Sequence, residues 1–162
     1  MSVRDDLLLT RRIAQFLYRE AEYADLHEYE EWEKLWEDDG IYWVPANGDG
    51  GDPDHEMSIL YDNRSRIALR VKQLMTGRRL AQSPLSRLSR SVSNVRIVGR
   101  EDDEIIVTAN VLIFESHTRG EQTWGTRTEY RLRERDDDFR IVRKKVVLTN
   151  NHKALYTMAF LV

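Results

Sequence analysis

The segment from Tyr29 to Pro45 constrains the fold of this chain most, because a helical pattern passes through one glycine into a strand pattern. In its first part, four apolar residues fall on one side of a helix, namely Tyr29, Trp32, Leu35 and Trp36. This spacing predicts a helix over residues 26–38. Residues 41–44 then predict a short strand, which stops at Pro45 because proline has no N–H to donate to a neighbouring strand.

Residues that favour helix ends stand where two of the predicted helices begin and stop. Asp25 and Glu28 have the spacing of a capping box for the helix just described. Gly40 stands where that helix would end in a left-handed conformation. Asp62 is placed to cap a third helix, which Gly77 would end.

Apolar periodicity predicts the other helices. A first helix over residues 5–24 follows from a stripe at Leu9, Ile13, Phe16, Leu17, Ala21 and Ala24. The third helix carries its own stripe at Ile67, Val71, Leu74 and Met75. Residues 46–54 are rich in Gly, Asp and Pro and predict a surface loop, followed by a short strand over 56–61. Residues 78–87 follow no regular pattern.

From Leu88 onward the apolar period changes to two. Strands are predicted at 88–99, 104–116, 121–135 and 139–149, with a last short strand over 155–162. The run IIVTANVLIF within the second of them is apolar at both alternating positions, so we expect it to be central and covered on both faces. Helices followed by an antiparallel meander predict an α+β fold, in one domain over residues 1–162.

The net charge of −3 hides a strong asymmetry along the chain. Residues 1–62 carry a net charge of −12, whereas residues 63–100 carry ten basic residues and no acidic one. Two arrangements fit: the two segments pack together within one chain, or they meet between neighbouring copies in a head-to-tail ring. Nucleic acid is a weaker third interpretation, because the chain as a whole is acidic.

Composition bounds the classes of protein further. No apolar run approaches the roughly 20 residues of a membrane span, and the N-terminus does not predict a signal peptide. The sequence contains no cysteine, which excludes disulfides and an iron–sulfur cluster held by cysteines of this sequence. We therefore expect a cytoplasmic protein that binds neither membranes nor nucleic acid.

Few residues predict chemistry of their own. The four histidines (His27, His55, His117 and His152) lack the spacing of a metal motif, and Glu115 with His117 makes at most half of a metal site. Four tyrosines could line a cavity, namely Tyr18, Tyr42, Tyr61 and Tyr130, but they are more typical of core packing. The four tryptophans fit a core or a protein interface. No catalytic, cofactor-binding or metal-binding residue is therefore predicted.

The helix-to-strand entry resembles the cone-shaped fold shared by nuclear transport factor 2 (NTF2), ketosteroid isomerase and scytalone dehydratase. This resemblance implies a cystatin-like cone of three N-terminal helices on a strongly curved, mainly antiparallel sheet of about six strands. Enzymes of that group often carry a catalytic carboxylate at the end of the strand before the proline. Here that position holds Val44.

Four motifs in order are similar to the beta (small) subunit of aromatic-ring-hydroxylating dioxygenases: YWVP at 42–45, SILYDNR at 58–64, TGRRLAQSPLSRLSRSVSNV at 76–95 and VRKKVVLTNN at 142–151. Two family patterns are the most specific, a strand–Tyr–Asp–x–Arg turn and a Pro–x–Ser–Arg–x–x–Arg loop before a Val–Ser–Asn–Val strand. Their matching residues include Tyr61, Asp62, Arg64, Pro84, Arg87, Arg90 and Asn94. Leu80 and Leu85 depart from the family, which often has tryptophan and proline there.

The resemblance implies a non-catalytic structural subunit. In such enzymes the alpha subunit holds a Rieske 2Fe–2S cluster and a mononuclear Fe(II), and it cis-dihydroxylates an aromatic ring with electrons from NAD(P)H through a reductase. The beta subunit forms the trimeric base of an α3β3 assembly. We expect Arg64, Arg87 and Arg90 to make buried or partner contacts, although an exposed position is equally compatible with each.

Two other functions stay open from the sequence. A stand-alone isomerase or dehydratase of the same fold would need a base inside the cone, and a non-enzymatic cone would bind a ligand there without chemistry. The sequence does not identify the aromatic substrate, whether the cone is open, or which residues make the subunit contacts.

Overall fold

The computed structural model describes residues 2–76, 85–152 and 160–162. Three helices precede most of the sheet: α1 (Val3–Asp25), α2 (Tyr29–Glu33) and α3 (Arg64–Met75). The strands are β1 (Trp36–Pro45), β2 (Ser58–Asp62), β3 (Arg87–Glu101), β4 (Glu104–His117), β5 (Gly120–Arg135) and β6 (Asp138–Leu148). The expected α+β architecture is confirmed.

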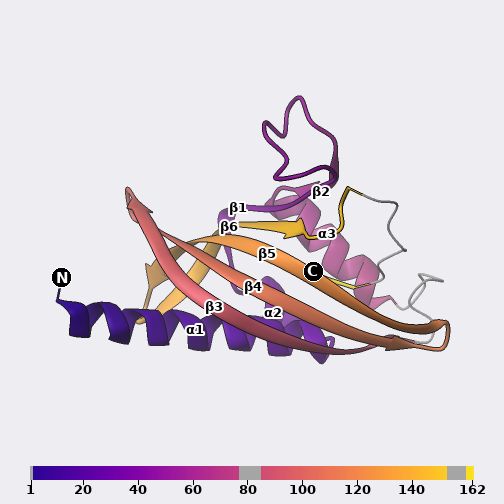
Figure 1. Ribbon diagram of the computed structural model, residues 1–162, viewed down its shortest axis with the longest axis horizontal. Coiled ribbons are helices and arrows are strands. Elements are labelled where there is room, and N and C mark those ends of the chain that lie inside the picture. Colours follow the sequence, from indigo (N-terminus) through magenta and orange to yellow (C-terminus); the bar gives the residue numbers. More distant parts are fainter. Residues whose placement is uncertain (1, 77–84, 153–159) are drawn as a thin grey trace.

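The six strands form one strongly curved sheet in the order β2-β1-β6-β5-β4-β3 (Figure 1). Neighbouring strands are antiparallel, apart from β1 and β6, which run parallel. Helix α1 lies along the long axis of the molecule beneath the sheet, and the loop between β1 and β2 stands away from the body (Figure 1). No helix in the described part of the chain combines the length and apolarity that a membrane crossing requires.

Helix α1 forms where the apolar stripe predicted it. Ser2 caps its start, because the Ser2 hydroxyl accepts from the backbone N–H of Asp5 and the Asp5 carboxylate accepts in return from the backbone N–H of Ser2. The stripe packs into the hollow of the sheet, where Ile13, Phe16 and Leu17 are almost fully buried. Phe16 meets Phe139 of β6 edge to face at 5.8 Å. The core of the molecule lies between this helix and the concave face.

The predicted helix over 26–38 is wrong in its length. Helix α2 spans five residues, and β1 already begins at Trp36. The backbone N–H of Ile141 in β6 donates to the Leu35 carbonyl at 2.7 Å, so pairing with a distant strand overrides the local helical pattern. Gly40 lies inside β1 without a left-handed conformation, and a Cβ there would come within 2.8 Å of the Trp36 ring.

Both predicted N-caps of the second and third helices are also wrong. Glu28 precedes α2 without a side-chain cap, and Asp25 instead accepts from the backbone N–H of Arg90. Asn63 caps α3 by accepting from the N–H of Arg66, which leaves Asp62 free to accept from the Arg70 guanidinium at 2.6 Å. The predicted stop at Gly77 lies outside the described residues.

Strands β3 to β6 agree with their predicted limits to within two residues. Strand β4, however, is covered on one face only, because Leu112 and Phe114 on its other face are 45% and 49% exposed. The predicted last strand falls mostly on residues 153–159, outside the described part of the chain, and residues 160–162 have no strand structure. Because Leu112 and Phe114 are exposed, the convex face of the sheet presents apolar side chains to solvent.

Candidate functional site

The interior of the cone holds a buried ion pair between α1 and β6. The Lys144 ammonium donates to both carboxylate oxygens of Glu20 at 3.1 Å, and both side chains are almost fully buried. The Trp32 indole N–H donates to the same carboxylate at 2.7 Å, and the Tyr130 hydroxyl donates to it at 3.1 Å. Glu20 thus links α1 to α2, β5 and β6.

Burial and charge act in opposite directions on this pair. Burial opposes the charged form of Glu20, but the Lys144 charge and the Trp32 hydrogen bond hold the pKa of Glu20 below its ordinary value. Burial lowers the pKa of Lys144, and the Glu20 charge offsets part of that effect. Burial and the nearby Glu20 carboxylate raise the pKa of Tyr130 well above its usual range. The cluster is therefore arranged as an ion pair with a tyrosine that stays protonated.

This arrangement predicts acid sensitivity. Because the folded-state pKa of Glu20 is lowered, its contribution to stability is present above the ordinary value of 4.5 and is lost as the pH falls through the folded-state pKa. We expect the midpoint of urea-induced unfolding, measured by circular dichroism, to decrease as the pH is lowered from 6 to 3. A Glu20→Gln variant should show a smaller decrease over the same interval, and an equal decrease would contradict this assignment.

The end of the described chain fills the cone beside the ion pair. The Tyr42 hydroxyl donates to the Val162 oxygen at 2.8 Å and accepts from the Val162 N–H at 2.9 Å. The Arg90 guanidinium donates to the Leu161 carbonyl and to the Asp25 carboxylate. The described residues leave about 10 Å³ around Glu20, which is near the lower limit for one water molecule. A substrate would have no room beside Glu20 in this conformation.

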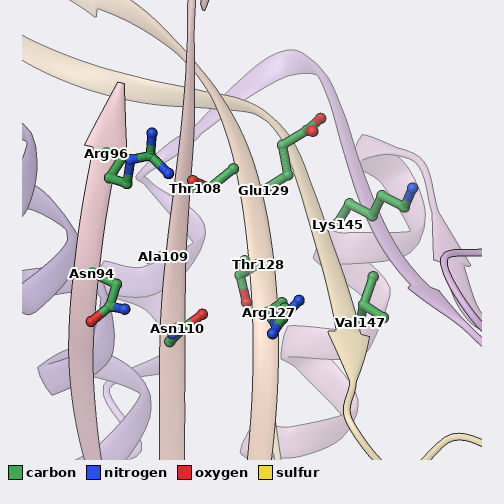
Figure 2. A pocket seen from close by; sticks show the side chains of 10 residues that line it. All are labelled: Asn94, Arg96, Thr108, Ala109, Asn110, Arg127, Thr128, Glu129, Lys145 and Val147. Carbon is green, nitrogen blue, oxygen red and sulfur yellow. The ribbon is translucent and has the colours of Figure 1, made fainter. Parts of the chain in front are cut away.

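The convex face of the same sheet carries an open polar hollow of about 370 Å³ across β3 to β6. Strand register places its side chains in two rows, which Figure 2 shows side by side. One row is Asn94, Asn110, Arg127 and Val147, and the other is Arg96, Thr108, Glu129 and Lys145. Alternation along each strand produces this face, because the intervening residues point into the core.

Apolar side chains continue this face toward the start of β3. Phe114 lies opposite Ser89 and next in the outward row after Leu112, and these two apolar side chains are half exposed. A second open hollow of about 350 Å³ surrounds Phe114 and is bordered by Arg87, Glu121 and Thr123. A large exposed surface with apolar and charged parts is typical of a protein interface.

Comparison with known proteins agrees with a subunit rather than a free-standing enzyme. The family model described as "Ring hydroxylating beta subunit" matches residues 19–153. The chain belongs to this family. It is 30% identical over 144 residues to the anthranilate 1,2-dioxygenase small subunit of Acinetobacter baylyi, covering 86% of this chain and 88% of that one.

Solved structures place the beta-subunit family within the expected fold. The beta subunit of benzoate 1,2-dioxygenase from Burkholderia mallei superimposes with a TM-score of 0.74 at 27% identity, covering 86% of this chain and 90% of that one. An NTF2-like protein with a cystatin-like fold from Novosphingobium aromaticivorans superimposes with a TM-score of 0.60 at 18% identity, covering 91% and 86%. The NTF2-like cone predicted from the helix-to-strand entry is confirmed.

The family-motif residues of this beta subunit lie in three separate places. Around β2, the half-exposed Tyr61 packs edge to face on Trp43, while Asp62 pairs with Arg70. The third motif residue there, Arg64, pairs with Glu33 of α2 at 2.9 Å. The two ion pairs thus join α3 to β2 and to α2.

The other motif residues all belong to the edge strand β3 but point to opposite faces. Arg90 lies inside the cone, whereas Arg87 and Asn94 lie on the convex face. Asn94 has a positive φ of 56° at a bulge in β3, a conformation that asparagine tolerates better than most residues. Pro84 lies outside the described residues. Partner contacts of Arg64 and Arg87 stay a prediction, and Arg90 is buried by contacts within its own chain.

Sequence reasoning missed the buried ion pair, although its signals were present. Glu20 continues the spacing of Ile13 and Leu17 on α1, and Lys144 shares the inward phase of Val146 on β6. A charged residue at a core position of each element indicates a partner inside the fold. The half metal site at Glu115 and His117 has a different role, because Glu115 accepts from the Ser86 hydroxyl at 2.6 Å.

Proposed function

We propose that this chain is the non-catalytic structural subunit of a ring-hydroxylating dioxygenase. As a single domain in the cytoplasm, it forms a trimer that carries three Rieske-type alpha subunits in an α3β3 assembly. The observation that carries this proposal is the family match over residues 19–153. The exposed convex face supports it, because it offers a surface for other subunits.

The iron centres and the nicotinamide belong to the partner proteins in this proposal. A Rieske cluster requires two cysteines and two histidines, and the sequence contains no cysteine. Among residues 2–76, 85–152 and 160–162, no three His, Asp or Glu side chains are grouped as ligands for a metal ion. The residues of this chain therefore do not fit either centre, and the Rieske cluster, the Fe(II) and the electrons from NAD(P)H enter through the alpha subunit and its reductase.

The names of two relatives support a proposal for the substrate class. The two dioxygenases compared above are named for anthranilate and benzoate, which are both aromatic carboxylates. We extend this class to the enzyme that contains the present chain. The alpha subunit would recognise the carboxylate, and the beta subunit would act by holding neighbouring alpha subunits at a fixed separation.

Two measurements test the proposal. Light scattering on the purified chain should give a trimer, and co-expression with its alpha subunit should give a hexamer. The hexamer should convert benzoate or anthranilate. The turnover rate of the alpha subunit without beta should be at least about tenfold lower, because iron centres held at the wrong separation slow the reaction. A monomer that ignores the alpha subunit would contradict the structural role, as would full turnover by alpha alone.

A further inference from the structure

The hollow on the convex face is strongly positive. Arg96, Arg127 and Lys145 line it, together with a single carboxylate, Glu129. That carboxylate already accepts from Arg143 at 3.1 Å, so it is neutralised within the sheet. No carboxylate in the described part of the chain pairs with Arg96 or Arg127, which are both exposed. Two guanidinium groups thus face outward without an acidic partner of their own chain.

A strongly acidic segment stands elsewhere on the same chain. The loop over residues 46–57 connects β1 to β2 and stands away from the body of the molecule (Figure 1). It exposes four carboxylates, at Asp49, Asp52, Asp54 and Glu56, and its one basic side chain is His55, which contacts Asp52 at 2.6 Å. Met57 at its end is 74% exposed and adds an apolar side chain.

This loop has a defined shape. The Asn151 amide donates to the Gly48 carbonyl at 2.8 Å, and its oxygen accepts from the Gly48 N–H at 3.1 Å. Gly50 is buried with a positive φ of 84°, and a Cβ there would meet Pro45 and Trp43 at less than 3 Å. A loop held in one conformation loses little entropy when it docks, which favours a role in binding.

We propose that the acidic loop of one copy docks in the positive hollow of the next copy around the trimer. This inference rests on the proposed trimer and adds the surfaces that form it. The loop and the hollow are different surfaces of one chain, so their contact is head to tail, and such contacts close into a ring when the rotation permits. Loop and hollow also occur in equal numbers in a ring of identical chains, so each loop has one hollow.

Apolar contacts would complete the interface. Leu112 and Phe114 continue the hollow along β4, and Met57 with Ile59 follows the acidic part of the loop. Charges would select the register of the two copies, and the apolar side chains would supply buried area. A ring of this kind should also weaken as ionic strength rises, because the charges lie near the surface.

A charge-swap experiment tests the contact in the full chain. Arg127→Glu with Lys145→Glu should weaken self-association at least about tenfold, and so should Asp52→Lys with Asp54→Lys. Combining all four substitutions restores opposite charges across the contact and should recover most of the trimer. Arg11→Glu and Glu22→Lys are matched controls on exposed positions of α1, and they should leave the trimer unchanged. Sedimentation velocity over a concentration series measures each variant, with circular dichroism to confirm folding.

The outcomes separate this inference from the proposed function. If both pairs of reversals trimerise like the unmodified chain, the docking is overturned and the trimer stands. If the charge-reversed variants form trimers but no longer bind the alpha subunit, the hollow binds the alpha subunit instead, and the docking is also overturned. If the unmodified chain forms no trimer with or without the alpha subunit, both proposals are overturned.

Discussion

Replacing Lys144 with methionine is expected to lower the free energy of unfolding by about 3–5 kcal/mol. The methionine fills similar space, but the Glu20 carboxylate would then keep only the Trp32 and Tyr130 hydrogen bonds in an interior that excludes water. A buried charge that loses its counter-charge retains its desolvation penalty without compensation. Urea unfolding at pH 7, followed by circular dichroism, measures the change.

The partner substitution separates pairing from packing. Combining Glu20→Gln with Lys144→Met removes both charges, so the double variant should be less destabilised than the sum of the two single variants. Lys72→Met is the control, because Lys72 is an exposed lysine on α3, away from the ion pair and from the hollow. Its effect should stay below about 1 kcal/mol. Additive single effects would show that Glu20 and Lys144 are not coupled.

Replacing Arg90 with alanine is the second large effect that we expect, at about 3 kcal/mol. The Arg90 guanidinium donates to the Asp25 carboxylate at the end of α1 and to the Leu161 carbonyl, and it lies 5.9 Å from the centre of the Phe160 ring. Its removal leaves the buried Leu161 carbonyl without this donor, and the partly buried Asp25 carboxylate keeps only the backbone N–H of residue 90. The free energy of unfolding from urea titrations checks this value.

Two variants sharpen the Arg90 experiment. Arg90→Lys should recover only part of the loss, because one ammonium cannot reproduce the forked contact to two separate acceptors. Arg87→Ala removes an arginine three positions earlier on the convex face and should change stability by less than about 0.5 kcal/mol. Equal losses for Arg87→Ala and Arg90→Ala would contradict the distinction between the two faces of β3.

Local patterns in the sequence predicted the elements that depend on neighbouring residues. The inward and outward positions of β5 can be assigned from the sequence because Tyr130 and Leu132 alternate with charged residues, and both faces have the burial that this alternation predicts. The first helix was predictable for the same reason, since its apolar stripe repeats over several turns. Burial on one side of a regular element leaves a regular trace in the sequence.

Features that depend on distant residues were not predictable in this way. The local pattern places Trp36 in a helix, but the Leu35 carbonyl accepts from the distant N–H of Ile141. The pattern also predicts that Asp62 is a helix cap, but Asp62 pairs with Arg70. The sequence predicts that strand β4 is buried on both faces because Leu112 and Phe114 are apolar, although both side chains remain about half exposed in the described chain. In the proposed trimer, that pattern would record contacts of the assembly in addition to those of the chain.

The pairing of β1 with β6 also sets the order in which the chain can fold. Trp36 and Ile141 are paired although about a hundred residues separate them, whereas the pairs β3–β4, β4–β5 and β5–β6 each join strands that are neighbours in sequence. Closing so long a loop is entropically unfavourable until the hairpins have already formed. During synthesis, the aromatic residues of β1 leave the ribosome long before their partner strand exists. Until β6 is synthesised, the aromatic residues of β1 lack their final strand partner, and during this period the chain is most prone to aggregation.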